Sequence, residues 1–373
     1  MRRSMILGTA AVMATGLLLA GCSSGNDDNA GSGETASSGG GDKPSVGVIL
    51  PDTKSSARWE TADAPLLKAA FEAAGVDADI QNAQGDKTQF QTIADQMLTN
   101  GVDVLVIVNL DSGSGKAVLQ KAKDQGVPTI DYDRLTLGGG ADFYVSFDNT
   151  EVGRLQGAGL QKCLDEKGKT QAKIAFLNGS PTDNNATLFN AGAVEALKPK
   201  MDSGDYTKVA DDAVPDWDNK QAQTIFEQQW TTTGGAIDGV LAANDGLANS
   251  VINVLKKNGV NGTIPVTGQD ATDQGLQNIL AGDQCMTVYK AIKKEADAAA
   301  GLAVALAKGE DASSQATGTV TDTETNKEVK AVLLKPEAIY FDNVKDVIAD
   351  GFTTKEKVCT AELAAKCTEA GIS

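Results

Sequence analysis

Polar side chains that can exchange hydrogen bonds with hydroxyl groups follow nearly every short apolar run of this chain. Carboxylates accept hydrogen bonds from hydroxyl groups, arginine and lysine donate to hydroxyl oxygens, and a carboxamide does both. Trp59 and Trp217 add flat apolar faces of the kind that cover the C–H side of a sugar ring. The set therefore favours a binding site for a neutral polyol. The polar members are Asp52, Arg58, Asp131, Asp133, Arg134, Asp148, Asn149, Asp183, Asn184, Asn185, Asn244, Asp245, Gln269, Asp270 and Lys290.

Composition excludes several other kinds of chemistry. The 373 residues include no histidine, which rules out serine triads, Cys–His dyads, histidine-liganded zinc and imidazole pH switches. The formal net charge of −17 repels phosphate backbones, so we expect no nucleic-acid partner. A binding site for a phosphorylated or carboxylated ligand typically has an excess of cations and glycine-rich helix starts, and the chain has neither. We expect no catalytic residue, no metal and no cofactor.

The hydrophobic pattern predicts the elements that must position these groups. Short β-branched runs alternate with longer helical stretches, and runs such as residues 104–108 are continuously apolar, as in a parallel sheet buried on both faces. The alternation occurs in two sets and predicts an α/β fold of two doubly wound, Rossmann-like parallel-sheet lobes. Strands are expected at 45–50, 78–82, 102–108, 129–132, 143–147, 173–177, 206–209, 239–242, 264–267 and 286–289. Helices are expected at 61–74, 87–99, 113–125, 150–167, 185–197, 219–232, 245–258, 273–281 and 291–307.

The polar groups follow the carboxyl ends of the predicted strands, where open parallel sheets bind their ligands. Any one of them also has a local interpretation, because Asp or Asn after a strand commonly caps the next helix. We expect Asp245 and Asp273 to be such caps and Trp230 to be a core residue. Lys290 could begin a solvated helix, and Arg134 could pair locally with Asp133. The prediction of a site rests on the recurrence of polar groups at one topological position.

The first residues resemble an export signal. Two arginines precede an apolar run at 5–19 that is too short to span a bilayer comfortably, and Leu-Ala-Gly-Cys22 follows. This pattern is typical of a bacterial lipoprotein signal, so we expect residues 1–21 to be removed and Cys22 to carry a lipid. Residues 22–44 are rich in Gly, Ser and Asp and predict a flexible tether. The folded part would hang from the outer face of the cytoplasmic membrane.

The remaining four cysteines form an even set in an exported, oxidising setting, which favours disulfides. Four cysteines allow three connectivities. We prefer Cys359–Cys367, which are close in sequence, together with Cys163–Cys285. Zinc is a poor alternative, because no pair has CxxC spacing. The acidic run at 216–219 lacks the glycine of an EF-hand-like calcium loop.

Several motifs together make the resemblance to one family specific. The chain from about residue 46 to 352 resembles the D-xylose-binding proteins of ABC importers, which belong to the type I periplasmic-binding-protein superfamily. The motifs occur in the same order and at matching spacings. They are Arg58-Trp59, Tyr132-Asp133-Arg134, the run from Phe143 to Asn149, Gly179-Ser180-Pro181 with Asp183-Asn184-Asn185, Ala243-Asn244-Asp245, Gly268-Gln269-Asp270-Ala271 and Thr287-Val288-Tyr289-Lys290.

The resemblance implies two lobes joined by three strand crossovers and closing on a pyranose, most readily D-xylose, for delivery to ABC permease subunits. Residues 45–147 and 291–333 would form the N-terminal lobe, and 148–290 and 334–373 the C-terminal lobe of a monomer. Hinge strands are expected near 146–149, 289–291 and 330–334. Trp59 and Trp217 would cover the two faces of the ring. The implied hydroxyl partners are Arg58, Asp133 and Arg134 from the first lobe, and Asp183, Asn185, Asn244, Asp270 and Lys290 from the second lobe and hinge. The resemblance does not decide between Asn184 and Asn185.

Other functions remain open at this stage. Paired carboxylates such as Asp131 and Asp133 are compatible with a glycosidase. Repressor sensor domains share the fold, but such a regulator needs a DNA-binding motif before residue 46, where this chain has the signal and tether. A receptor that feeds a membrane sensor would leave no readable motif. Ribose, glucose or arabinose could replace xylose, because these sugars differ by one hydroxyl or hydroxymethyl group.

Overall fold

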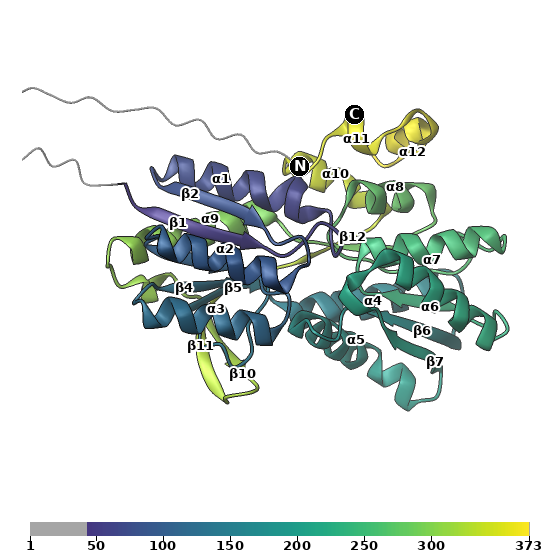
Figure 1. Cartoon of the computed structure of the whole chain (residues 1–373). Helices are drawn as coiled ribbons and strands as arrows, with labels where there is room; N and C mark the ends of the chain where they lie inside the picture. Colours follow the sequence, from purple (N-terminus) through teal and green to yellow (C-terminus); the bar gives the residue numbers. More distant parts are fainter. Residues whose placement is uncertain (1–42, 373) are drawn as a thin grey trace, which may run out of the picture. The chain divides into compact units, whose positions relative to one another are not determined.

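A seven-stranded sheet forms the core of one lobe, the N-lobe, in the computed structural model, which describes residues 43–372 (Figure 1). The strand order is β10-β11-β5-β4-β3-β1-β2, and every pair is parallel except β10 with β11. The strands are β1 (Ser45–Leu50), β2 (Asp77–Asn82), β3 (Val104–Ile107), β4 (Thr129–Tyr132), β5 (Phe143–Phe147), β10 (Gly318–Asp322) and β11 (Lys327–Leu334). The expected signal segment, most of the tether and Cys22 lie outside the described residues.

Helices cover both faces of this sheet, as the continuous apolar strands require. Val46 and Val48 of β1 pack on one face with α1 (Ala64–Ala73) and α9 (Ile292–Ala307). Ile49, of opposite parity, packs on the other face with α2 (Lys87–Thr99) and α3 (Ser112–Asp124). Successive side chains of a strand point to opposite faces, so an apolar run serves two cores at once.

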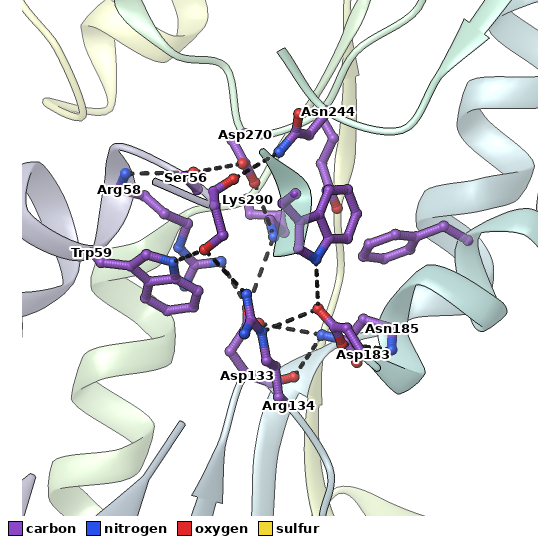
Figure 2. A pocket seen from close by; sticks show the side chains of 14 residues that line it. Ser56, Arg58, Trp59, Asp133, Arg134, Asp183, Asn185, Asn244, Asp270 and Lys290 are labelled. Carbon is purple, nitrogen blue, oxygen red and sulfur yellow. Dashed lines mark hydrogen bonds and ion pairs between the residues drawn. The ribbon is translucent and has the colours of Figure 1, made fainter. Parts of the chain in front are cut away.

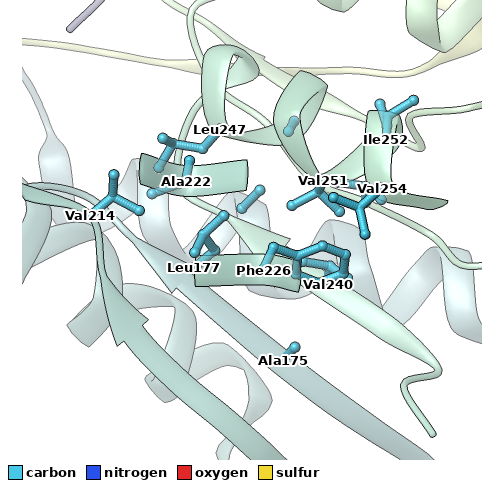
Figure 3. Packing of buried hydrophobic residues seen from close by; sticks show 14 of the residues in the cluster. Ala175, Leu177, Val214, Ala222, Phe226, Val240, Leu247, Val251, Ile252 and Val254 are labelled. Carbon is cyan, nitrogen blue, oxygen red and sulfur yellow. The ribbon is translucent and has the colours of Figure 1, made fainter. Parts of the chain in front are cut away.

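The second lobe, the C-lobe, repeats this layering on a smaller parallel sheet of order β7-β6-β8, made of β6 (Ala172–Asn178), β7 (Tyr206–Ala213) and β8 (Gly239–Ala242). The helices α6 (Asn219–Thr232) and α7 (Asp245–Lys257) cover one face, where Phe226 of α6 and Val251 of α7 pack with Leu177 of β6 (Figure 3). On the other face lie α4 (Asn149–Glu166) and α5 (Asn184–Asp202). Strands β9 (Thr287–Tyr289) and β12 (Glu337–Ile339) form an antiparallel pair beside α4.

The chain passes between the two lobes three times. It leaves the N-lobe sheet at the end of β5 and enters α4, returns from β9 into α9, and leaves again from β11 into β12. The first and third passages lie side by side, because the Asp148 N–H donates to the Leu334 carbonyl at 2.9 Å. These passages coincide with the segments expected to act as hinge strands, and their motion stays a prediction.

One predicted strand is wrong. Residues 264–267 make only an isolated bridge, between Val240 and Val266. Pro265 has no N–H to donate. The Thr267 hydroxyl also takes up part of the ladder, since it accepts from the Ala242 N–H and donates to the Ala242 carbonyl, both at 3.0 Å. The pattern also missed β10 and β12, which are short and half exposed.

A C-terminal segment follows β12 and packs on α8 (Asp273–Ala281) and the passage from β9. It contains α10 (Val344–Ala349), α11 (Lys355–Val358) and α12 (Ala364–Glu369). The structure joins Cys359 to Cys367 within this segment, and Cys163 on α4 to Cys285 before β9. No helix within residues 43–372 is long and apolar enough to cross a membrane.

Candidate functional site

A polar pocket lies between the two lobes, and all ten side chains expected to bind a sugar line it (Figure 2). They come from segments spread over more than two hundred residues, which the opposed carboxyl ends of the two sheets bring together. Every one of the ten is at least nine-tenths buried. Four further residues line the pocket, namely Ser55, Ser56, Phe189 and Gln269.

Arg58 and Lys290 meet at Asp133. The Arg58 Nη1 donates to Asp133 Oδ2 at 2.7 Å, and the Lys290 Nζ lies 3.8 Å from the same oxygen. Lys290 also pairs with Asp270 Oδ1 at 3.0 Å. Burial alone raises the pKa of Asp133, but the nearby cations Arg58, Lys290 and Arg134 outweigh it and hold that pKa below its ordinary value. Asp133 is therefore a carboxylate that accepts hydrogen bonds.

Asp183 forms the centre of a second cluster, on the C-lobe side. Its Oδ2 lies 3.1 Å from the Arg134 Nε and accepts a hydrogen bond from the Trp217 indole at 3.1 Å. The Asp183 Oδ1 accepts from the Asn185 N–H at 2.9 Å, so the same residue caps α5. Burial raises the pKa of Asp183, and Arg134 offsets part of that effect. The cluster fixes the indole that forms one wall of the pocket.

Asn185, and not Asn184, points into the pocket. Its Nδ2 donates across the cleft to the Asp133 carbonyl at 2.9 Å, and its Oδ1 accepts from Asn149 Nδ2 at 2.9 Å. The opposite indole, Trp59, donates to the Ser55 hydroxyl at 2.9 Å and lies under the Arg58 guanidinium, 4.6 Å from its ring centroid. Both ring walls are thus held by partners that are themselves buried.

Two contacts join the lobes at the loop before Arg58. The Ser56 hydroxyl donates to Asp270 Oδ2 at 2.8 Å, and the Asn244 Nδ2 donates to the Ser55 carbonyl at 3.1 Å. Figure 2 shows the first of these contacts as a dashed line between the labelled Ser56 and Asp270. This loop of the N-lobe is therefore hydrogen-bonded directly to the C-lobe.

The backbone of the pocket is unusually constrained. Asp133, Trp217 and Asp270 have φ values of 60°, 55° and 93°, in the left-handed region that side chains other than glycine rarely adopt. Asp216 and Ala271, next to two of them, have φ values of 53° and 48°. Such strain persists only where surrounding structure over-determines it, and it concentrates at functional sites.

The other polar groups that follow strand ends have local roles. Asp131 accepts from the Thr136 N–H and hydroxyl, both at 2.7 Å, and it does not line the pocket, so no Asp131–Asp133 acid–base pair forms there. Asp148 caps α4. Asp52 accepts from the backbone N–H groups of Lys54 and Ser55. Trp230 packs, partly buried, against the core of the C-lobe.

The expected caps Asp245 and Asp273 are corrected by the structure. The cap of α7 is Asn244, whose Oδ1 accepts from the Leu247 N–H at 2.9 Å, and the cap of α8 is Thr272. Asp245 is instead buried beneath the pocket loop, where its side chain accepts from the Thr272 N–H and from Thr287 at 2.8 Å. The two helices begin at Asp245 and Asp273, as the pattern predicted, and the residue before each one caps it, because Asn and Thr cap as well as Asp.

Of the four further lining residues, Gln269 belongs to the polar set that follows the predicted strands, and the other three were missed although the sequence carries a signal for each. Ser55 and Ser56 lie in the loop that carries Arg58, and Phe189 is one helical turn after Asn185 on α5. Gln269 directly precedes Asp270, and its buried Oε1 has no partner among the described residues. Within residues 43–372 no three metal-ligating side chains cluster in a way that could hold a metal ion.

Comparison with known proteins agrees with this geometry. The family model described as a periplasmic binding protein domain matches residues 46–311. A D-xylose-binding periplasmic protein of Escherichia coli is 36% identical over 311 residues, covering 82% of this chain and 90% of its own length. A multiple sugar-binding periplasmic protein of Azospirillum brasilense is 37% identical over 333 residues, covering 84% and 91%.

Solved structures show the same fold. A carbohydrate-transporter solute-binding protein of Chloroflexus aurantiacus, in complex with D-glucose, superimposes with a TM-score of 0.77 at 27% identity, covering 84% of this chain and 97% of that one. A Clostridium phytofermentans solute-binding protein with bound β-D-glucose has a TM-score of 0.75 at 29% identity, with coverage of 84% and 99%. These relatives and neighbours are solute-binding proteins and not enzymes.

Proposed function

The chain belongs to the periplasmic binding protein domain family, as an extracytoplasmic sugar-binding protein of the ABC-transporter type, and from that premise we propose that its cleft pocket captures D-xylose. The single observation that carries the proposal is the lining of this pocket. Two indoles, one from each lobe, face a ring of buried carboxylates, carboxamides and cations that suits a neutral pyranose. The relatives from Escherichia coli and Haemophilus influenzae, at 36% and 35% identity, are D-xylose-binding proteins.

Capture follows from how the pocket is divided. Arg58, Asp133 and Arg134 belong to the N-lobe, whereas Asp183 and Trp217 belong to the C-lobe. Either half alone offers an incomplete set of partners, so a sugar gains its full set of hydrogen bonds only when the lobes are together. The ligand then selects closure through its differential affinity for the two arrangements. X-ray scattering curves that superimpose with and without xylose would refute this account.

Glucose is the second candidate ligand, because two structural neighbours at 27% and 29% identity hold D-glucose or β-D-glucose. The two sugars differ at one hydroxymethyl group. A tightly packed pocket binds a sugar weakly when the sugar leaves buried polar groups of the pocket without hydrogen-bond partners, or when it is too large for the space. Ribose and arabinose test the orientation of the hydrogen-bonding groups in the pocket and not its size, since they differ from xylose in the configuration of hydroxyl groups.

A thermal-shift panel of pentoses and hexoses on the mature protein tests the proposal. A ligand that binds only the folded state stabilises it by RT ln(1 + [L]/Kd), about 2.7 kcal/mol at a hundredfold excess over Kd. We expect xylose to give the largest shift at equal concentration. Trp217→Ala should abolish the response. Trp230→Ala, which removes the C-lobe tryptophan outside the pocket, should keep it. A larger shift with glucose would reassign the ligand, and no shift with any sugar would refute the proposal.

We also propose that the protein is held at the membrane through a lipid on Cys22 and delivers its sugar to ABC permease subunits. The basis is the sequence pattern that ends at Cys22 together with the family. Metabolic labelling with a fatty acid should mark the parent chain and not a Cys22→Ser variant, which should be released from membranes. Equal labelling or equal membrane retention of the two would refute the anchor. Xylose uptake that is lost with this chain and restored by it would identify an importer as distinct from a sensory receptor.

A further inference from the structure

We infer that Glu295, which the pattern of the sequence did not single out, is a positioning residue for sugar binding that acts through Arg58. Glu295 lies on α9, in the second layer behind the pocket, and does not line it. Its Oε2 accepts a hydrogen bond from the Arg58 Nη2 at 2.8 Å. The inference rests on the proposed function, because it assumes that Arg58 contacts a sugar.

A π-helical turn prepares the other half of this arrangement. Residues Trp59–Asp63 form the turn, in which the Ala64 N–H bonds to the Trp59 carbonyl five residues earlier. This five-residue spacing places the Asp63 side chain on the same side of the turn as the side chain of Arg58, which comes five residues earlier in the chain. The Arg58 Nε and Nη2 donate to the two Asp63 oxygens at 2.8 and 2.7 Å, a bidentate contact. Single π turns of this kind occur frequently at functional sites.

The guanidinium is nearly saturated by these contacts. It has five N–H groups. Two donate to Asp63, one to Glu295 and one to Asp133, which leaves one N–H on Nη1, the nitrogen that faces Asp133. Asp63 and Glu295 therefore bind three N–H groups, those on Nε and Nη2, and this orients the remaining nitrogen, Nη1, toward the pocket. A ligand meets an arginine that is already oriented and loses little conformational entropy on binding.

Burial makes the contact with Glu295 costly to break. Glu295 and Asp63 are both fully buried, and Arg58 is 3% exposed. Without an acceptor at position 295, one Nη2 proton would remain in a site closed to water, and an unsatisfied charged donor carries a full desolvation penalty. The guanidinium would turn to find another partner, and Nη1 would turn with it.

The proton on Glu295 provides a second readout. Burial raises its pKa to about 8, with Arg58 opposing and Asp133 and Asp63 adding to the rise. The other charged or titratable groups around it are Lys290 before α9, Tyr132 on β4 and Tyr144 on β5. Its Oε1 has no partner among the described residues. A sugar in the pocket takes the place of solvent beside Arg58 and Asp133, lowers the polarity around the cluster and favours the neutral acid, so affinity should fall once Glu295 ionises.

The test compares five variants with the parent by calorimetric titration of xylose. Glu295→Gln keeps an acceptor for Nη2 and should bind within about threefold of the parent, whereas Glu295→Leu should bind at least about tenfold more weakly. Asp297→Asn is the matched control. Asp297 lies on the same helix, is exposed and, within residues 43–372, pairs only with Lys293 at 2.6 Å, so its removal should leave the affinity unchanged. In an Arg58→Lys background, Glu295→Leu should cause little additional loss, because the group that it positions is gone.

Two results would overturn the inference. One is parental affinity in Glu295→Leu, and the other is an equal loss in the Arg58→Lys background, which would indicate a general effect on folding. If the leucine variant does not fold, the pH profile decides. The affinity of the parent should weaken about twofold to threefold between pH 7 and pH 9 and that of Glu295→Gln should not, and identical profiles would overturn the inference. A parent chain that binds no sugar would instead refute the proposed function.

Discussion

Gly179 offers a test of the pocket by a residue that does not line it. Gly179 follows β6, and a β-carbon built there would overlap the six-membered ring of Trp217, with even Cζ3 only 2.5 Å away. Carbon atoms pack at about 3.5–4.0 Å. Gly179→Ala therefore requires the indole to move by about 1 Å or more. The backbone at Gly179 is outside the left-handed region, so this overlap is the main effect of the substitution.

The expected loss can be worked from the contacts of the ring. Displacement breaks the 3.1 Å hydrogen bond from the Trp217 indole to Asp183, and a hydrogen bond to a charged group contributes about 1.5–3 kcal/mol. It also removes the flat contact with the sugar, worth about 0.5–1.5 kcal/mol. Together these terms amount to about 2–4.5 kcal/mol, or a loss of affinity of roughly thirtyfold to two-thousandfold.

Calorimetric titration with xylose, alongside thermal unfolding, measures the effect. Gly318→Ala is the matched control, because a β-carbon at Gly318 meets nothing within 4 Å and the backbone there is also ordinary. Trp217→Phe in the Gly179→Ala background should bind as Trp217→Phe does alone, since the smaller ring relieves the overlap. Parental affinity in Gly179→Ala would refute the reasoning, because the indole would then not be needed where the structure places it.

Three further changes test other parts of the molecule. Asp270→Ala should abolish the thermal shift with xylose, because it removes the carboxylate that pairs with Lys290 at 3.0 Å, and an undiminished shift would move the site elsewhere. Replacing Cys359 and Cys367 together with serine should lower the free energy of unfolding by about 2.5 kcal/mol through lost loop-closure entropy; a parental midpoint in urea would contradict this. Burial raises the pKa of Asp131 to about 7, above about 3.9 in an unfolded chain. The folded protein thus keeps a proton that the unfolded chain releases, and this stabilisation is complete below about pH 4 and is lost as the pH rises to about 7. Asp131→Asn should remove up to about 1.4 kcal/mol per pH unit of this dependence, and parallel unfolding curves for parent and variant would argue against it.

The alternation of apolar runs and helical stretches was sufficient to predict two parallel-sheet lobes. A strand such as residues 104–107 is apolar at every position because both of its faces are buried, and that requirement is visible locally. The polar residues that follow such strands were predictable for the same reason, since parallel strands direct their carboxyl ends to one edge. The prediction of a strand at 264–267 was wrong because Pro265 and the Thr267 side chain interrupt the hydrogen-bond ladder. A hydrophobic pattern does not show where a backbone N–H is absent or where a side chain takes the place of a backbone group.

Whether a polar residue at a strand end caps a helix, lines the pocket or does both was visible only in the tertiary structure. Asn244 both caps α7 and reaches the Ser55 carbonyl of the other lobe, and Asp183 both caps α5 and holds Trp217. Sequence reasoning weighs these roles as alternatives, whereas one side chain with several acceptor and donor positions can perform both.

The residue types at the strand ends, and with them the class of ligand that the pocket suits, could be read from the order of residues alone. Which of those residues meet, and what lies behind them, depends on the packing of the two lobes. Ser56 and Asp270 are 214 residues apart, and Arg58 and Glu295 are 237 apart, so no local periodicity connects them. Periodicity reports only which face of an element is buried. The identity of the buried partner depends on how two lobes and a π turn place distant side chains within hydrogen-bond distance of each other.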